Sequence, residues 1–274
     1  MPIHPTAIIH PGAILGRDNI IGPYCVVDAN VTLGDGNWLG PFVHLTGHTE
    51  IGSGNRFHSG SVIGDAPQDL KYKDEPTRVR IGDSNQFREH VTIHRSNKLS
   101  DDTVVGSHNY LMANAHLGHN VKLGNHVIIA NGALLAGHVE VADRVFISGN
   151  CLVHQFTRLG TLSLMQGGSG IGMDLPPYTI SQGVNQICGL NIIGLRRAGI
   201  PPQERLELKK LYRLLFRSGL NLREALKKAA GEFKSEPANI FINFVGRTGR
   251  GVCRDVSSVR KDKETNEDAA SPVD

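Results

Sequence analysis

The strongest constraint on the fold is a large apolar residue at every sixth position, beginning at Ile3 and ending at Ile171. Neither the 3.6-residue period of a helix nor the two-residue alternation of a half-buried strand gives this spacing. Of the 29 positions in this register, only Asp69 and Glu75 are not large and apolar. A period of six predicts a solenoid with one short strand in each hexad, in which three hexads close a triangular coil of about 18 residues.

The same hexads predict how the solenoid is filled. The large residue points inward and stacks on its counterpart one coil away, about 4.8 Å along the axis. Glycine often follows it, as at Gly16, Gly34 and Gly106, because glycine adopts the backbone angles of a tight corner at no steric cost. With 32 glycines and only 5% aromatic residues, the composition suits a narrow interior. We therefore expect an all-β parallel β-helix rather than a sandwich or an α/β core.

Two segments interrupt the hexads. Asp69 and Glu75 lie in the polar segment 65–80, and a second break covers about residues 96–102. We expect both segments to be loops that leave the solenoid, and excursions from a rigid scaffold commonly carry function. Leu99 still fits the register of six and is expected to point inward.

The pattern changes after Ile171. Proline pairs at 176–177 and 201–202 mark a transition, and apolar residues then recur at helical spacing. Residues 1–190 are expected to form the solenoid, 191–253 a small α-helical domain, and 254–274 a charged, disordered tail. Three helices are expected around Leu208, Leu211, Tyr212 and Leu215, around Leu222, Ala225, Leu226 and Ala229, and around Ile240, Phe241, Phe244 and Val245.

Composition and charge exclude several classes of protein. The four cysteines have no paired spacing, which argues against a disulfide framework or zinc ribbon and favours a reducing compartment. No apolar run is long enough to span a membrane, and the N-terminus lacks the pattern of a signal peptide. The net charge of +3 is too small to indicate nucleic-acid binding. We expect a cytoplasmic protein without stable membrane insertion.

One cluster of histidines stands out among the 13 in the chain. Gly137 follows His119 by one 18-residue coil, so the two should stack, and His116 and His138 should lie in the same patch, about 10 Å across. A single solenoid histidine is usually a solvated rim residue. The stacked group favours either a metal site, for which no third ligand is evident, or a general base, which needs one imidazole beside the attacking hydroxyl.

Several motifs resemble one family of hexapeptide-repeat enzymes, the UDP-N-acetylglucosamine O-acyltransferases of lipid A synthesis. The similarity covers about residues 1–250. The matching segments are 68–72 (QDLKY), 75–78 (EPTR), 91–95 (VTIHR), 111–116 (LMANAH), 135–139 (LAGHV), 153–156 (VHQF), 174–178 (DLPPY), 189–191 (GLN) and 194–197 (GLRR).

This resemblance implies a left-handed β-helix, a homotrimer with sites between subunits, and no cofactor. The implied reaction moves an (R)-3-hydroxyacyl group from acyl carrier protein to the glucosamine 3-hydroxyl of UDP-N-acetylglucosamine, without an acyl-enzyme. His119 matches the catalytic base, the Gly137 amide the oxyanion donor, and Gly167 the position that limits acyl-chain length. Substrate binding is implied for Gln68, Asp69, Lys71, His116, His138, His154, Gln155, Asn191 and Arg197.

The chain departs from the family pattern at Asn120, Ile193 and Ala198, which affects tuning of the base and contacts to uridine and phosphate. A 3-amino sugar nucleotide as acceptor, acetyl-CoA as donor and a non-catalytic binding solenoid remain alternatives. The choice of donor, assayed with both sugar nucleotides, distinguishes them. A basic surface on the first helices favours docking of an acidic carrier protein. Its residues are Arg196, Arg197, Arg205, Lys209, Lys210, Arg213 and Arg217.

Overall fold

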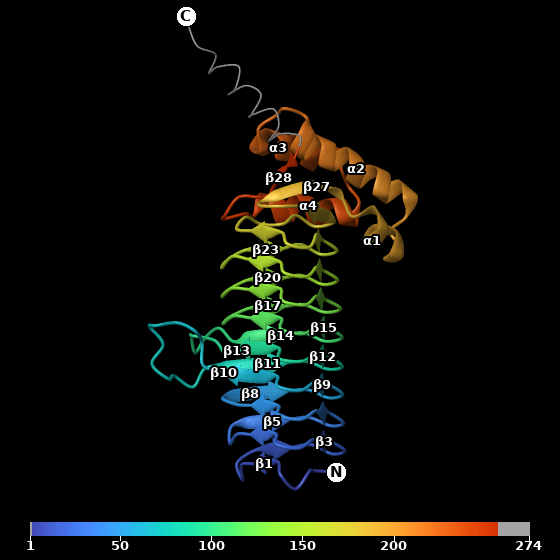
Figure 1. The fold of residues 1–274 in the computed structure, drawn as a ribbon. Helices are drawn as coiled ribbons and strands as arrows, with labels where there is room; N and C mark the ends of the chain where they lie inside the picture. Colours follow the sequence, from blue (N-terminus) through green and yellow to red (C-terminus); the bar gives the residue numbers. More distant parts are fainter. Residues whose placement is uncertain (1, 257–274) are drawn as a thin grey trace, which may run out of the picture.

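The computed structural model describes residues 2–256, which form a left-handed parallel β-helix with helices at its C-terminal end (Figure 1). Three sheets make the walls of the triangular solenoid, and the chain visits sheet B, sheet C and sheet A in turn. Sheet B comprises β1 (Ile8–Ile9), β4 (Val26–Val27), β7 (His44–Leu45), β10 (Val62–Asp65), β13 (Thr92–His94), β16 (His116–Leu117), β19 (Leu134–Leu135), β22 (Leu152–Val153) and β25 (Gly170–Ile171).

The other two walls are also built from short strands, of two to five residues. Sheet C comprises β2 (Ile14–Leu15), β5 (Val31–Leu33), β8 (His48–Ile51), β11 (Arg78–Ile81), β14 (Thr103–Val105), β17 (Lys122–Leu123), β20 (Glu140–Val141) and β23 (Arg158–Leu159). Sheet A comprises β3 (Ile20–Ile21), β6 (Trp38–Leu39), β9 (Arg56–Phe57), β12 (Gln86–Phe87), β15 (Tyr110–Leu111), β18 (Ile128–Ile129), β21 (Phe146–Ile147), β24 (Leu164–Met165), β26 (Thr179–Ser181), β27 (Gln186–Leu190) and β28 (Arg254–Asp255).

The inward residues of the hexads form the core, as the period predicts. Phe57 and Phe87 are fully buried and stack at 4.8 Å between ring centroids, one coil apart. The first coil is open to solvent, because nothing in the described chain covers its outer end, and Ile3 is 40% exposed. The solenoid is therefore a continuous apolar column that stiffens the walls carrying the polar residues.

Both predicted loops leave the solenoid at neighbouring coils, between β10 and β11 and between β13 and β14 (Figure 1). The coil with the first loop pairs positions 30 residues apart, and the coil with the second pairs positions 24 apart. Both lengths exceed 18 by a multiple of six, so the sequence register continues through loops that are not solenoid. Leu99 was wrongly predicted to point inward: it lies in the second loop and is 65% exposed.

A buried ladder of asparagines joins the coils at the corner between sheets C and A, and it was not predicted. Each Oδ1 of the first four members accepts a hydrogen bond from the backbone N–H of the asparagine in the next coil, at 2.8–2.9 Å, and Oδ1 of the last, Asn109, accepts from the Val127 N–H at 2.7 Å. The ladder satisfies buried amides that would otherwise lack partners. Its members are Asn19, Asn37, Asn55, Asn85 and Asn109.

Four helices follow the solenoid. The three expected from their apolar spacing are α2 (Pro202–Arg217), α3 (Leu222–Glu232) and α4 (Glu236–Gly246). The fourth, α1 (Ile192–Arg197), is too short for a periodic signal and is capped by the Asn191 side chain. Among residues 2–256, no helix is both long and apolar enough to cross a membrane.

The predicted start of the tail at Arg254 is wrong by at least two residues. Arg254 and Asp255 form β28, which pairs with β27, and Asp255 is buried. The Asp255 carboxylate accepts hydrogen bonds from Arg217 and Tyr212, so it fastens this strand to α2. The rest of the expected tail, residues 257–274, lies outside the described part of the chain.

Candidate active site

His119 and Gly137 lie against each other at the corner between sheets B and C, as the 18-residue step predicts. The His138 N–H donates to the His119 carbonyl at 2.9 Å, which joins the two coils. The His119 ring occupies the space where a side chain at Gly137 would begin: a Cβ there would lie 2.5 Å from Cε1 and 2.6 Å from Nε2. Only glycine at 137 leaves the ring in this position.

Asn120 fixes the orientation of the His119 ring. Its Nδ2 donates to the Asp101 carbonyl at 2.7 Å and to the Asp101 carboxylate at 3.0 Å. Its Oδ1 accepts from the Asn97 N–H at 3.1 Å and lies 2.8 Å from His119 Nδ1. Because this oxygen can only accept, Nδ1 must carry the hydrogen, and Nε2 keeps its lone pair. His119 is thus held in the tautomer that a general base requires.

His138 lies beside His119 and is enclosed on three sides. Its ring meets the His119 ring edge-on at 5.2 Å and stacks on Phe156 at 4.7 Å. Its Nδ1 is 3.7 Å from the Asp101 carboxylate. Burial is the main cause that lowers the His138 pKa, with the positive charge of a protonated His119 adding to it. His138 is therefore a neutral hydrogen-bonding group near neutral pH.

The first loop brings acidic and basic side chains to the same corner. Asp69 accepts from the Lys71 N–H at 3.0 Å and from the Asn97 amide at 2.8 Å, and these bonds lower the pKa of its carboxyl. Arg95 donates to the Tyr72 hydroxyl at 2.9 Å and thereby holds the loop to the solenoid. Asp69 is therefore ionised at neutral pH and fixed near the histidines.

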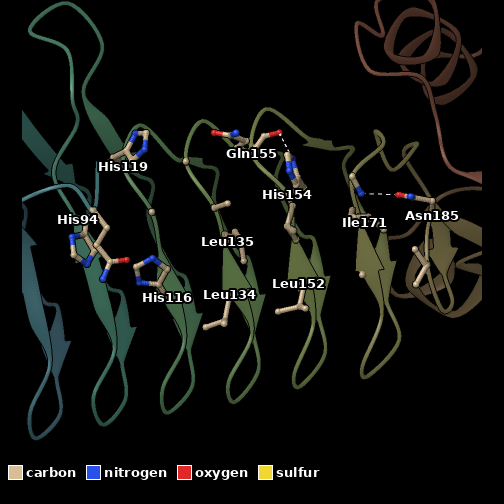
Figure 2. Close-up of a pocket in the computed structure, with 18 residues that line it drawn as sticks. His94, His116, His119, Leu134, Leu135, Leu152, His154, Gln155, Ile171 and Asn185 are labelled. Atoms are coloured by element: carbon tan, nitrogen blue, oxygen red, sulfur yellow. Dashed lines mark hydrogen bonds between the residues drawn. The ribbon is translucent and has the colours of Figure 1, made fainter. Parts of the chain in front are cut away.

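His116 lies on the sheet B face below His119, at the position that pairs with Leu134 (Figure 2). Burial lowers its pKa to about 4, and the nearby His94 ring contributes. Its Nδ1 is 2.8 Å from the Thr92 hydroxyl, and its ring meets His94 edge-on at 5.1 Å. His116 is neutral at physiological pH and can offer a hydrogen bond without a charge.

A cavity of about 700 Å³ covers this face of sheet B and includes both histidines. From His116 the outer positions of successive strands continue as Leu134, Leu152 and Gly170. Leu134 and Leu152 are 42% and 54% exposed, and Val184 beyond them is 71% exposed. Figure 2 shows the polar groups His119, His154 and Gln155 along one edge and the leucines on the strands. The cavity thus has a polar end and an apolar row.

Comparison with known proteins identifies the family to which this chain belongs. The model described as UDP-N-acetylglucosamine O-acyltransferase, domain 2, matches residues 174–253, and the hexapeptide-repeat model matches residues 30–65 and 102–137. The acyl-[acyl-carrier-protein]–UDP-N-acetylglucosamine O-acyltransferase of Syntrophobacter fumaroxidans is 45% identical over 93% of this chain and 100% of its own length. The enzyme of the same name from Myxococcus xanthus is 46% identical over 92% of this chain and 99% of its own length. The chain belongs to the UDP-N-acetylglucosamine O-acyltransferase family.

Solved structures agree with this assignment over most of the chain. The UDP-N-acetylglucosamine acyltransferase of Francisella novicida superposes with a TM-score of 0.90 at 36% identity, covering 94% of this chain and 95% of that one. The UDP-N-acetylglucosamine acyltransferase of Bacteroides fragilis superposes with a TM-score of 0.89 at 38% identity, covering 92% of this chain and 100% of that one. The family fold therefore includes the solenoid and the helices together.

Other predicted site residues of this family member lie on a different wall. Asn191 and Arg197 line a second cavity, of about 750 Å³, on sheet A together with Ile193 and Ala198. The Asn191 side chain caps α1 and also donates to the Leu162 carbonyl at 2.9 Å. Two walls of a triangular solenoid face different directions, so one chain does not bring this group to His119.

The remaining predicted positions are placed as follows. Gln68, His154 and Gln155 line the sheet B cavity, and Lys71 is exposed on the first loop. Gly167 lies at the corner between sheets A and B and lines neither cavity; a Cβ there would meet only the Gly149 carbonyl, at 3.6 Å.

Sequence reasoning missed five polar residues near the site, one of which is Asp101, already described as a partner of Asn120. His94 and Asn185 line the sheet B cavity, Asn97 links the two loops, and Arg250 donates to the Gly172 carbonyl at 2.9 Å. His94 stands in a matched motif, whereas loop and C-terminal contacts leave no periodic signal. Within residues 2–256, no group of three or more His, Cys, Asp or Glu residues is arranged to hold a metal ion.

Proposed function

We propose that this protein transfers an (R)-3-hydroxyacyl group from acyl carrier protein to the glucosamine 3-hydroxyl of UDP-N-acetylglucosamine, the first step of lipid A synthesis. The observation that carries the proposal is the His119 ring, with a free Nε2, packed on the Gly137 backbone at the polar end of an apolar row. The names of relatives at 41–46% identity support the same donor and acceptor.

The reaction follows from the positions of these groups. Nε2 of His119 takes the proton of the sugar hydroxyl as its oxygen attacks the thioester carbonyl. The Gly137 N–H, which has no hydrogen-bond partner among the described residues, stabilises the oxyanion of the tetrahedral intermediate. When the intermediate collapses, the C–S bond breaks and the imidazolium returns the proton to the leaving thiolate. No covalent enzyme intermediate is needed.

The apolar row on sheet B fits the acyl chain. Leu134, Leu152 and Val184 expose apolar surface in line, and Gly170 leaves a gap between them. Each methylene that leaves water against such a surface contributes about 0.8 kcal/mol. A long acyl chain is therefore the occupant that best explains solvent-exposed leucines beside catalytic polar groups.

We infer that a complete site combines the walls of two chains in a homotrimer. The base lies on the sheet B side, whereas Asn191 and Arg197 lie on sheet A. In the cyclic trimer proposed here, the corner between sheets A and B lies at the axis and sheet B of one subunit faces sheet A of its neighbour, which would place the Arg197 cation within the neighbour's cavity. The exposed, stacked rings of Tyr24 and Phe42 at the corner between these sheets also suit burial between subunits.

The choice of donor and acceptor tests the function. Purified protein is given acyl carrier protein carrying a 3-hydroxyacyl group, or acetyl-CoA, with UDP-N-acetylglucosamine or its 3-amino analogue. We expect rapid transfer only from the carrier protein, and an ester at the 3-position of UDP-N-acetylglucosamine. Preference for the amino sugar, for acetyl-CoA, or no turnover with any pair would each refute the proposal in a different way.

Mixed trimers test the shared site. His119→Ala and Arg197→Ala subunits are each expected to be inactive alone. After denaturation and refolding together in equal amounts, about one quarter of the sites combine two intact walls. Recovery of about a quarter of wild-type activity is expected, and no recovery from refolded trimers would show that both residues act within one chain.

A further inference from the structure

A carboxylate on the second loop is the centre of the contacts that surround the base. Asp101 Oδ2 accepts from Asn120 Nδ2 at 3.0 Å and lies 3.7 Å from His138 Nδ1. Its Oδ1 is 2.7 Å from Lys122 Nζ. Although burial opposes it, the hydrogen bond from Lys122 lowers the pKa of Asp101, so the group is a carboxylate at neutral pH. Neither the sequence motifs nor the family comparison assigned a role to this residue.

We propose that Asp101 is a positioning residue that acts on His119 through Asn120; this inference rests on the proposed function. The Asp101 acceptors hold the Asn120 amide with its oxygen toward His119 Nδ1. Rotation of that amide would place Nδ2 against Nδ1–H and would also leave the Asn97 N–H without its acceptor. The second loop thus secures the tautomer in which Nε2 is free to accept a proton.

The charge of Asp101 has a second effect. When His119 takes the sugar proton it becomes an imidazolium, and the neutral Asn120 amide alone cannot balance that charge. The Asp101 carboxylate polarises the amide between them, and hydrogen bonds to charged groups are stronger than neutral ones. Asp101 therefore stabilises the protonated base as it forms, without touching substrate.

Exchange of the two side chains tests this role. Asp101→Asn should lower kcat at least about tenfold while the KM of each substrate stays within about threefold. The double variant Asp101→Asn/Asn120→Asp places a carboxylate 2.8 Å from Nδ1 but loses the 2.7 Å hydrogen bond to the residue 101 carbonyl, so kcat should recover in part, at least about fivefold over the single variant. Asp102→Asn, which removes the 2.8 Å ion pair with Arg80 from the same loop, is the matched control and should leave kcat unchanged.

Several outcomes would overturn the inference. They are wild-type kcat for Asp101→Asn, a double variant as slow as the single one, or a loss as large in Asp102→Asn. The first two would show that the carboxylate does not act through residue 120, and the third that the loop matters only for folding.

A readout that needs no turnover separates this inference from the proposed function. In protein labelled with ¹⁵N-histidine, the His119 signals should show hydrogen on Nδ1, and Asp101→Asn should raise the share of the Nε2–H tautomer. An unchanged tautomer would overturn the positioning role even if the acyltransferase activity is present. A wild-type protein inactive on every donor would instead refute the proposed function and leave this measurement valid.

Discussion

Gly137→Ala isolates the position of the base from every other feature of the site. A Cβ at residue 137 would lie 2.5 Å from His119 Cε1, whereas ordinary contacts begin near 3.4 Å. The ring must therefore move by about 1 Å, and displacement of this size at a reacting group costs about 10²-fold in rate. This corresponds to about 2.7 kcal/mol of transition-state stabilisation. Alanine keeps the N–H at 137, so the loss would report the ring alone.

The assay is kcat for acyl transfer, with the Kd for UDP-N-acetylglucosamine measured in parallel. We expect kcat to fall about 10²-fold, with Kd within about threefold and little change in thermal stability, since the His119 side chain is partly exposed. Gly149→Ala is the control, because its Cβ would meet only the Asn131 carbonyl, at 3.4 Å. Near-wild-type kcat in a folded Gly137→Ala protein would refute the proposed geometry of base and backbone.

Three further predictions address the donor, the acyl chain and acid stability. Charge reversal at Lys209 and Lys210, both exposed on α2, should raise the KM for acyl carrier protein severalfold at low salt but not the KM for the sugar nucleotide. The control is charge reversal at Lys227 and Lys228, the two exposed lysines of α3. Gly167 lines neither cavity of one chain but lies at the corner between sheets A and B, where the proposed trimer brings two walls together. Gly167→Met should therefore shift preference toward shorter acyl donors in competition assays, and an unmoved preference would place the end of the channel elsewhere. The lowered pKa of His116 means that the unfolded chain binds the extra proton between about pH 4 and 6.5, so stability should fall as the pH falls through this window. Between pH 7 and pH 5, the free energy of unfolding measured with urea should fall less in a His116→Gln variant than in wild type, by about 2 kcal/mol.

The solenoid and its central pair of residues follow directly from the period of six. One coil is three hexads, so His119 and Gly137 must be neighbours wherever the register is unbroken. The loops could not be placed by the same argument. They add lengths that are multiples of six, so the register conceals them, and Leu99 was assigned to the core although it lies in solvent.

The contacts around the His119 ring could be predicted only in part. Successive strand residues point to opposite faces, which argues against a contact between His119 and Asn120, but that alternation breaks down at a corner, where Asn120 can orient the ring through a hydrogen bond. The structure confirms the corner: Asn120 has a φ of +59°, and its side chain turns back to the ring. Its partners Asn97 and Asp101 come from a loop without periodicity. The proposed pairing of two walls from different subunits also leaves no signal in the register of one chain.

Turnover of His119→Ala in the presence of bound sugar nucleotide is the most direct measurement of the central claim. The side chain is partly exposed at a corner, so its removal should leave the solenoid folded. With acyl carrier protein as donor, we predict that kcat falls at least about 10²-fold while UDP-N-acetylglucosamine binds with a Kd within about threefold of wild type. A folded His119→Ala protein that turns over at the wild-type rate would show that this histidine is not the base and would contradict the mechanism proposed here.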